Sequence, residues 1–148
     1  MLKNAIRQTT AAALGKIQAH RRHIHRHPEP SFSERKTGAY VAHALADMGI
    51  VHSEGWCAER GAAGIVARIE GMEPGTKKVA LRADMDALPI QEVDRPHASA
   101  VPGWMHACGH DAHTACLLGA AEVLQSTKHL WNGTVQLVFQ PGEEILPG

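Results

Sequence analysis

The residues best suited to chemistry lie in one short stretch, residues 105–113, which reads Met-His-Ala-Cys-Gly-His-Asp-Ala-His. It holds one thiol, three imidazoles and one carboxylate, and all of these groups bind borderline-soft divalent metals. Gly109 lets the backbone bend between Cys108 and His110, so that both side chains can turn toward one point. Thiolate and neutral imidazole together suit zinc or a similar transition ion. The stretch therefore predicts a metal site rather than a buried cysteine among loop histidines.

Two adjacent carboxylates, Glu143 and Glu144, follow the apolar segment 133–140. Metal-assisted hydrolysis needs ligands that fix the ion, a water bound to it, and a base that takes the proton of that water. Because bound zinc lowers the pKa of water to about 7, a nearby carboxylate suffices as the base. One glutamate can therefore ligate the metal while its neighbour, facing another way, handles protons.

A second pair of carboxylates, Asp84 and Asp86, follows the apolar segment 78–83. Residues two apart share one side of an extended strand, so both side chains can face the same site. One of them can ligate a metal or orient His110 by a hydrogen bond. Alternatively, Asp84 pairs with Arg82 and has a purely structural role. The sequence leaves both roles open.

The helices that must position these clusters are predicted from apolar residues at helical spacing. The first spans about 4–26 and ends before a proline. The second opens with Ser33 as its N-cap and closes at Gly49. A third spans 112–125, with Asp111 as its cap. Because arginines alternate with histidines near the end of the first helix, a solvated face is favoured there over a metal patch. Those histidines are His20, His23, His25 and His27.

The strands are predicted from runs of β-branched and apolar residues. They cover 50–52, 63–69, 78–83 and 133–140. Segment 70–75 reads as a hairpin-type connection, and the proline-rich segment 87–104 as a long irregular excursion of functional importance. Helices that alternate with strands indicate an α/β fold with a mostly parallel or mixed sheet. Ligands of such sheets bind beyond the carboxyl ends of strands, where the charged clusters lie.

Composition excludes several classes of protein. With 148 residues, 44% hydrophobic and 20% charged, the chain has the profile of a soluble globular domain. Lys plus Arg equals Asp plus Glu at 15 each, so nothing favours binding to nucleic acid or to an anionic membrane. No apolar run approaches the length of a membrane span. The three cysteines, Cys57, Cys108 and Cys116, are too few and too scattered for a disulfide framework, and a reducing cytoplasm is expected.

Four segments of the sequence, 25–32, 82–89, 105–113 and 139–144, resemble in order and spacing the motifs of one known family. This is the zinc aminoacylase and carboxypeptidase superfamily, metallopeptidase family twenty. More narrowly, the motifs are similar to those of its amidohydrolase branch, which includes hippurate hydrolase, N-acyl-amino-acid amidohydrolases and the plant auxin-conjugate hydrolases. The resemblance runs from about residue 20 to residue 148.

The resemblance implies roles for particular residues. Cys108, His110 and Glu144 would be metal ligands and Glu143 the general base, and we add Asp86 to the catalytic residues. Two divalent metal ions would occupy each complete site, with zinc favoured over manganese, cobalt or nickel. The implied fold is the three-layer α/β catalytic domain of the zinc aminopeptidase and aminoacylase type, a mixed sheet flanked by helices, with a smaller dimerisation domain inserted into it.

In this family, two further histidine ligands come from downstream of the glutamate pair, whereas this sequence stops at Gly148. We therefore expect residues 1–148 to be the N-terminal portion of the catalytic domain, without the inserted domain and the C-terminal part. Such a fragment is expected to be inactive, and the full-length protein to be a homodimer.

The predicted function is a cytoplasmic, metal-dependent amidohydrolase that cleaves the amide bond of N-acyl amino acids, such as hippurate or N-acetyl amino acids, or of short peptides. Two alternatives remain. A non-catalytic module could hold one structural zinc on the cluster Cys108, His106, His110 and His113. A cysteine hydrolase could use Cys108 with a nearby histidine, although this would leave the paired carboxylates unexplained.

Overall fold

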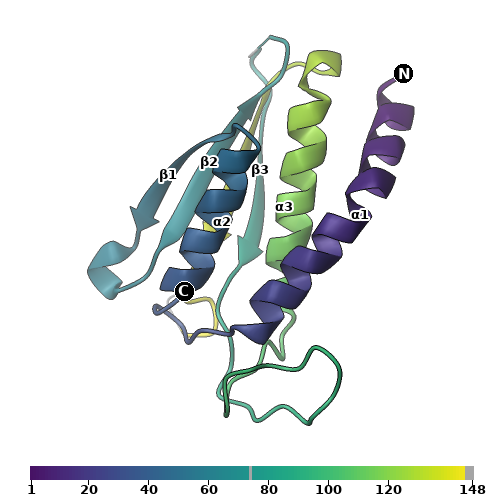
Figure 1. Ribbon diagram of the computed structural model, residues 1–148. Helices are drawn as coiled ribbons and strands as arrows, with labels where there is room; N and C mark the ends of the chain where they lie inside the picture. The colour runs from purple at the N-terminus through teal and green to yellow at the C-terminus, as the bar shows by residue number, and fades with distance from the viewer. Residues whose placement is uncertain (74, 146–148) are drawn as a thin grey trace.

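Within residues 1–73 and 75–145, which the computed structural model describes, four strands form one mixed sheet in the order β1-β2-β4-β3 (Figure 1). The strands are β1 (Val51–Trp56), β2 (Gly64–Glu70), β3 (Lys78–Asp84) and β4 (Thr134–Gln140). Strand β2 is antiparallel to both β1 and β4, whereas β3 is parallel to β4. The predicted α/β fold, with a mixed sheet flanked by helices, is confirmed.

The predicted hairpin-type connection at 70–75 is wrong, because β2 and β3 are not neighbours. Strand β4 lies between them and pairs with both. Its central position has a physical basis in its alternating side chains, since Leu137 and Phe139 are buried and lie opposite Ala67 and Ile65 of β2. The parallel pairing of β3 with β4 brings the carboxyl ends of these two strands side by side, with Asp84 opposite Gln140.

Three α-helices in the described part of the chain flank the sheet: α1 (Leu2–Arg26), α2 (Arg35–Asp47) and α3 (His110–Ser126). Helices α2 and α3 pack on the sheet, and α1 packs along α3 (Figure 1). Two short 3-10 helices, Ala58–Arg60 and Lys128–Leu130, lie in connections. Among the described residues, none of the helices has the length and apolar character to cross a membrane.

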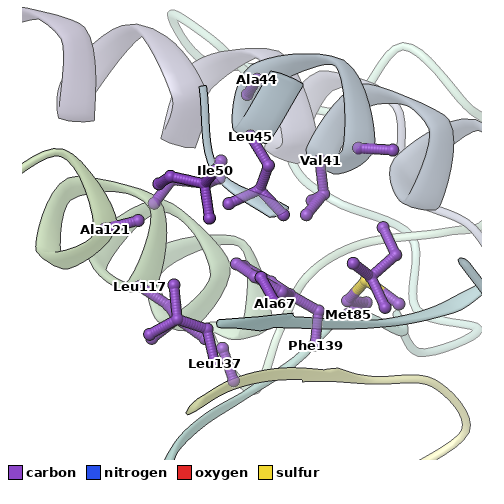
Figure 2. Close-up of a cluster of buried hydrophobic side chains, with 14 of the residues drawn as sticks. Val41, Ala44, Leu45, Ile50, Ala67, Met85, Leu117, Ala121, Leu137 and Phe139 are labelled. Carbon is purple, nitrogen blue, oxygen red and sulfur yellow. The ribbon is translucent and has the colours of Figure 1, made fainter. Parts of the chain in front are cut away.

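The hydrophobic core lies between the sheet and helices α2 and α3 (Figure 2). Side chains alternate along each strand, so that one face of β2 and β4 supplies apolar groups to the core. Burying a Leu, Ile or Phe side chain contributes roughly 1.5–3 kcal/mol to folding, which makes this layer the main source of stability. Its largest members are Phe139, Leu45, Ile65, Ile69, Met85, Leu118, Leu137 and Val41.

The N-terminus of α2 is not capped by Ser33, as predicted. The N-cap position is Glu34, and its side chain makes no capping hydrogen bond. Glu29 takes that role instead, since its carboxylate accepts the backbone N–H groups of Lys36 at 3.1 Å and Thr37 at 2.7 Å. A residue several positions upstream can cap this helix because the intervening loop folds back over its first turn.

Two predictions are wrong for one reason. Asp111 does not cap α3, and His25 does not lie on a solvated face of α1, because these two side chains bind each other. Asp111 lies inside the first turn of α3, after the N-cap Gly109. Its carboxylate accepts hydrogen bonds from Arg21 at 2.7 Å and from His25 at 2.8 Å. His25 is buried, and its other ring nitrogen lies 3.1 Å from Oε2 of Glu92 in the 87–104 excursion. This buried cluster ties α1 and the excursion to the start of α3.

Candidate metal centre

The charged clusters meet at the lower end of the sheet in Figure 1, where β3 and β4 end and α3 begins. Cys108, His110 and Glu144 place one possible ligand atom each within 4.8 Å of one another. A second group, Asp84, His110 and His113, meets the same criterion and shares His110. Residues from three separate segments thus converge on the imidazole of His110.

The imidazole of His110 is oriented by Asp86. Its Nδ1 lies 3.0 Å from the backbone oxygen of Asp86 and 3.1 Å from Oδ1 of the same residue. Because both partners are acceptors, Nδ1 carries the proton and Nε2 is left with a free lone pair. Nε2 faces carboxylates of Asp84 at 3.8 Å, Glu143 at 3.7 Å and Glu144 at 3.8 Å. A histidine held in this way presents Nε2 as a metal ligand.

Asp86 is almost completely buried, with 1% of its surface exposed. Its Oδ2 accepts the hydroxyl of Ser31 at 2.7 Å and the backbone N–H of Glu144 at 2.9 Å. Burial opposes ionisation of this carboxyl, but the hydrogen bonds from His110, Ser31 and Glu144 outweigh it and lower the pKa of Asp86 to about 2. Asp86 is therefore an anion that fixes both the ring of His110 and the backbone of Glu144.

Asp84 pairs with Arg82, as expected if its role is structural. Arg82 Nη2 lies 2.6 Å from Asp84 Oδ1. The other carboxylate oxygen, Oδ2, lies 3.4 Å from Nδ1 of His113, and the Thr114 hydroxyl donates to the backbone oxygen of Asp84 at 2.7 Å. Asp84 thus pairs with Arg82 and faces His110 at once, so the structure keeps both of its predicted roles open.

The donor set of the first cluster fits a divalent transition ion. Oε1 of Glu144 is buried and has no hydrogen-bond partner among the described residues. A hydrogen bond to Glu144 raises the pKa of the Cys108 thiol, and the hydrogen bond to Asp86 raises the pKa of His110. Without a cation, the neighbouring carboxylates therefore favour the protonated forms of the thiol and of the imidazole. A thiol, an imidazole and a carboxylate with an unpartnered oxygen are groups that an ion such as Zn²⁺ would bind together.

His106 lies apart from both clusters, although it belongs to the same stretch of sequence. Only 4% of its surface is exposed, and neither ring nitrogen has a hydrogen-bond partner among the described residues. Burial lowers the pKa of His106 to about 4, so the ring is neutral. A single zinc on Cys108, His106, His110 and His113 is therefore not the arrangement that the fold favours.

Sequence reasoning missed the residues that hold this site from the N-terminal side. Ser31 donates to Asp86, and Glu34 accepts the backbone N–H of Gly142 at 2.7 Å. The signal was available in part, since the matched motif 25–32 contains Ser31 and ends two residues before Glu34, but the motif alone assigned them no role. A serine and a glutamate near a helix start are ordinary capping residues, so only tertiary contacts reveal what these two bind.

Comparisons with known proteins agree with this geometry. Residues 80–148 match the model of Peptidase family M20/M25/M40. The chain is 43% identical, over 100% of its length, to the N-acyl-L-amino acid amidohydrolase of Geobacillus stearothermophilus, of which it covers 39%. It is 48% identical, over 84% of its length, to thermostable carboxypeptidase 1 of Saccharolobus solfataricus, of which it covers 31%.

A solved structure shows the same fold. The crystal structure of the Bacillus subtilis YXEP protein, described as a dinuclear metal binding peptidase from the M20 family, matches with a TM-score of 0.84 and 41% identity. The match covers 93% of this chain and 38% of that one. The chain thus spans between 31% and 39% of the length of these three proteins. The resemblance predicted from the motifs is confirmed: residues 80–148 match Peptidase family M20/M25/M40, and the chain is similar to an N-acyl-L-amino acid amidohydrolase.

Proposed function

We propose that this chain carries ligands and the general base of a metal-dependent amidohydrolase that cleaves the amide bond of N-acyl amino acids. The observation that supports this most strongly is the orientation of His110, whose Nδ1 is held by Asp86 while Nε2 faces Glu143 and Glu144. The relation to an N-acyl-L-amino acid amidohydrolase supports the substrate class. Residues 1–148 would then form part of a catalytic domain.

In this proposal, Cys108, His110 and Glu144 hold a divalent cation, with zinc as the favoured ion. A second ion would complete the site with ligands from outside the described residues. When bound, such ions polarise the scissile carbonyl and make water acidic enough to be deprotonated near neutral pH. The buried Asp86 keeps His110 in the tautomer that offers Nε2, and it fixes the backbone of Glu144.

Glu143 is proposed as the proton carrier. Its side chain is 40% exposed, and Oε2 lies 3.7 Å from His110 Nε2, so it borders the cluster while staying open to substrate. The carboxylate would take a proton from the attacking water and deliver it to the nitrogen of the leaving amine. Glu144, with 17% of its side chain exposed, is the more enclosed of the pair and is suited to the ligand role.

The experiment is a hydrolysis assay on the complete gene product that contains residues 1–148. N-acetyl amino acids and hippurate serve as substrates, before and after removal of metal by EDTA. Hydrolysis that is lost with EDTA and restored by zinc or manganese is the expected result. Activity that resists chelation but is lost in Cys108→Ser would instead support a cysteine hydrolase and overturn the proposal.

A further inference from the structure

The turn that carries Glu143 and Glu144 is held by a residue from the other end of the chain. Its first residue, Gly142, donates its backbone N–H to Oε1 of Glu34 at 2.7 Å. Glu34 is fully buried, with 0% of its surface exposed. A buried carboxyl group destabilises a fold unless it is hydrogen-bonded, so the presence of Glu34 at this position needs an explanation.

The start of α2 does not require the Glu34 side chain. It makes no capping hydrogen bond, and Glu29 already accepts the N–H groups of the first helical turn. Its second oxygen, Oε2, is buried without a hydrogen-bond partner among the described residues. Backbone N–H groups of Glu34 itself and of Phe32 also act on this carboxyl group, and the N–H of Gly142 is the contact that comes from the other end of the chain.

Phe32 confines the same turn by close packing. A Cβ atom added to Gly142 would lie 2.4 Å from two carbons of the Phe32 ring, and Gly142 has a φ of +67°. Both facts require glycine at this position. The Arg60 guanidinium lies over the Phe32 ring, 3.7 Å from its centroid, which fixes the ring from another side.

The two backbone N–H groups that flank Glu143 thus donate to two different buried carboxyl groups. Gly142 donates to Glu34, and Glu144 donates to Asp86. Ser31, three residues before Glu34, donates its hydroxyl to that same Asp86. Segment 31–34 therefore holds the turn that carries Glu143 and Glu144, called the glutamate turn below, in two ways. Glu34 binds the turn directly, and Ser31 binds it through Asp86.

We propose that Glu34 is a positioning residue of the metal site. By holding the N–H of Gly142, it sets the path of the backbone from which Glu144 reaches Cys108 and His110. This inference rests on the proposed function, because it assumes that these three residues bind a cation. It assigns to the N-terminal segment the task of keeping a ligand of the site in place.

The test is a Co²⁺ titration of the metal-free complete gene product that contains residues 1–148, monitored by the near-ultraviolet charge-transfer band of thiolate-bound cobalt. Removing a residue that supports a metal ligand costs about 10–100-fold in metal affinity, and Glu34→Ala is expected to fall in that range. Glu34→Gln keeps an oxygen acceptor at the same reach and is expected to recover most of the affinity. Glu34→Asp keeps the carboxyl group but shortens the reach, so it should resemble Glu34→Ala.

The matched control is Glu29→Ala, which removes a carboxylate from the same segment that binds α2 instead of the glutamate turn. It should lower the melting temperature and leave the cobalt affinity unchanged. Wild-type affinity in both Glu34→Ala and Glu34→Asp would overturn the inference, as would an equal loss in Glu29→Ala. Where Glu34→Ala fails to fold by circular dichroism, Glu34→Asp against Glu34→Gln decides. A wild-type chain without the cobalt band would overturn the proposed metal site itself, and this inference with it.

Discussion

The carboxylate of Asp86 accepts the backbone N–H of Glu144 at 2.9 Å, and this bond joins the segment just after β3 to the turn that follows β4. The same carboxylate holds Nδ1 of His110 at 3.1 Å. One buried anion therefore orients two of the three proposed metal ligands, although the sequence separates them by 34 positions.

Replacement of Asp86 by Ala should weaken Co²⁺ or Zn²⁺ binding by about 10–100-fold, because both His110 and Glu144 lose the group that orients them. The measurement is a metal titration with a competing chelator. Asp47→Ala is the control, since that carboxylate is 70% exposed at the end of α2, remote from the cluster. Equal affinities in the two variants would contradict the role given to Asp86.

Among the three cysteines, only Cys108 should be needed for metal binding. Cys108→Ala and His110→Ala should each lower the metal content of the purified chain, because each removes one donor atom of the cluster. Cys57→Ala and Cys116→Ala should leave it unchanged, since neither residue belongs to a candidate metal group of the described chain. Metal analysis of the four variants side by side tests the assignment, and equal content in Cys108→Ala and Cys116→Ala would refute it.

Two helical glycines should respond in opposite ways to replacement by alanine. A Cβ on Gly38 of α2 would lie 2.6 Å from the backbone oxygen of Ala63, so Gly38→Ala should destabilise the chain by about 1–3 kcal/mol. Gly15 of α1 has nothing within 4 Å of the added carbon, and Gly15→Ala should stabilise by about 0.5–1 kcal/mol. Urea unfolding of both variants provides the measurement. A stable Gly38→Ala protein would show that α2 does not pack this closely on the chain before β2.

His106 should make the metal-free chain sensitive to acid. Its pKa is about 4 in the folded chain, below the ordinary value of 6.5, because burial disfavours the charged ring. As pH falls, the unfolded chain binds a proton at His106 before the folded chain does. The contribution of the neutral ring to stability is therefore fully present above about pH 6.5 and declines toward pH 4. The loss is on the order of 3 kcal/mol.

The measurement for His106 is urea unfolding in the presence of EDTA at several pH values between 7.5 and 4. The variant His106→Gln cannot ionise, so it should show a smaller loss of stability across this range than the wild type. Parallel curves for the two proteins would mean that His106 is not the group responsible.

Local sequence patterns predicted most of the elements but not their order in the sheet. Helix α1 and strands β3 and β4 lie within one or two residues of their predicted bounds, because apolar periodicity is a local property. The insertion of β4 between β2 and β3 depends on pairing between segments about 70 residues apart. The turn-forming residues of segment 70–75 carry no information about that long-range pairing.

The same difference between local patterns and long-range contacts applies to the candidate site. The residues of the 105–113 stretch and the glutamate pair could be named from the sequence because several metal-binding groups stand close together there. Their ligand roles stay predictions. The buried positions of His25, Glu34 and Asp111 could not be predicted, because each depends on a partner 86 or more residues away. A histidine among arginines looks solvent-exposed until the carboxylate that it binds is known.

The central claim is that Glu144 holds the metal while Glu143 moves the proton, and one parallel measurement tests it most directly. Metal content and hydrolysis of N-acetyl amino acids are measured together for Glu143→Gln and Glu144→Gln in the complete gene product. Glu143→Gln should keep its metal while kcat falls by about 10²–10⁴, because an amide has the shape of the carboxylate but cannot accept a proton. Glu144→Gln should lose metal. Loss of metal in Glu143→Gln, with normal content in Glu144→Gln, would contradict the assignment and reverse the two roles.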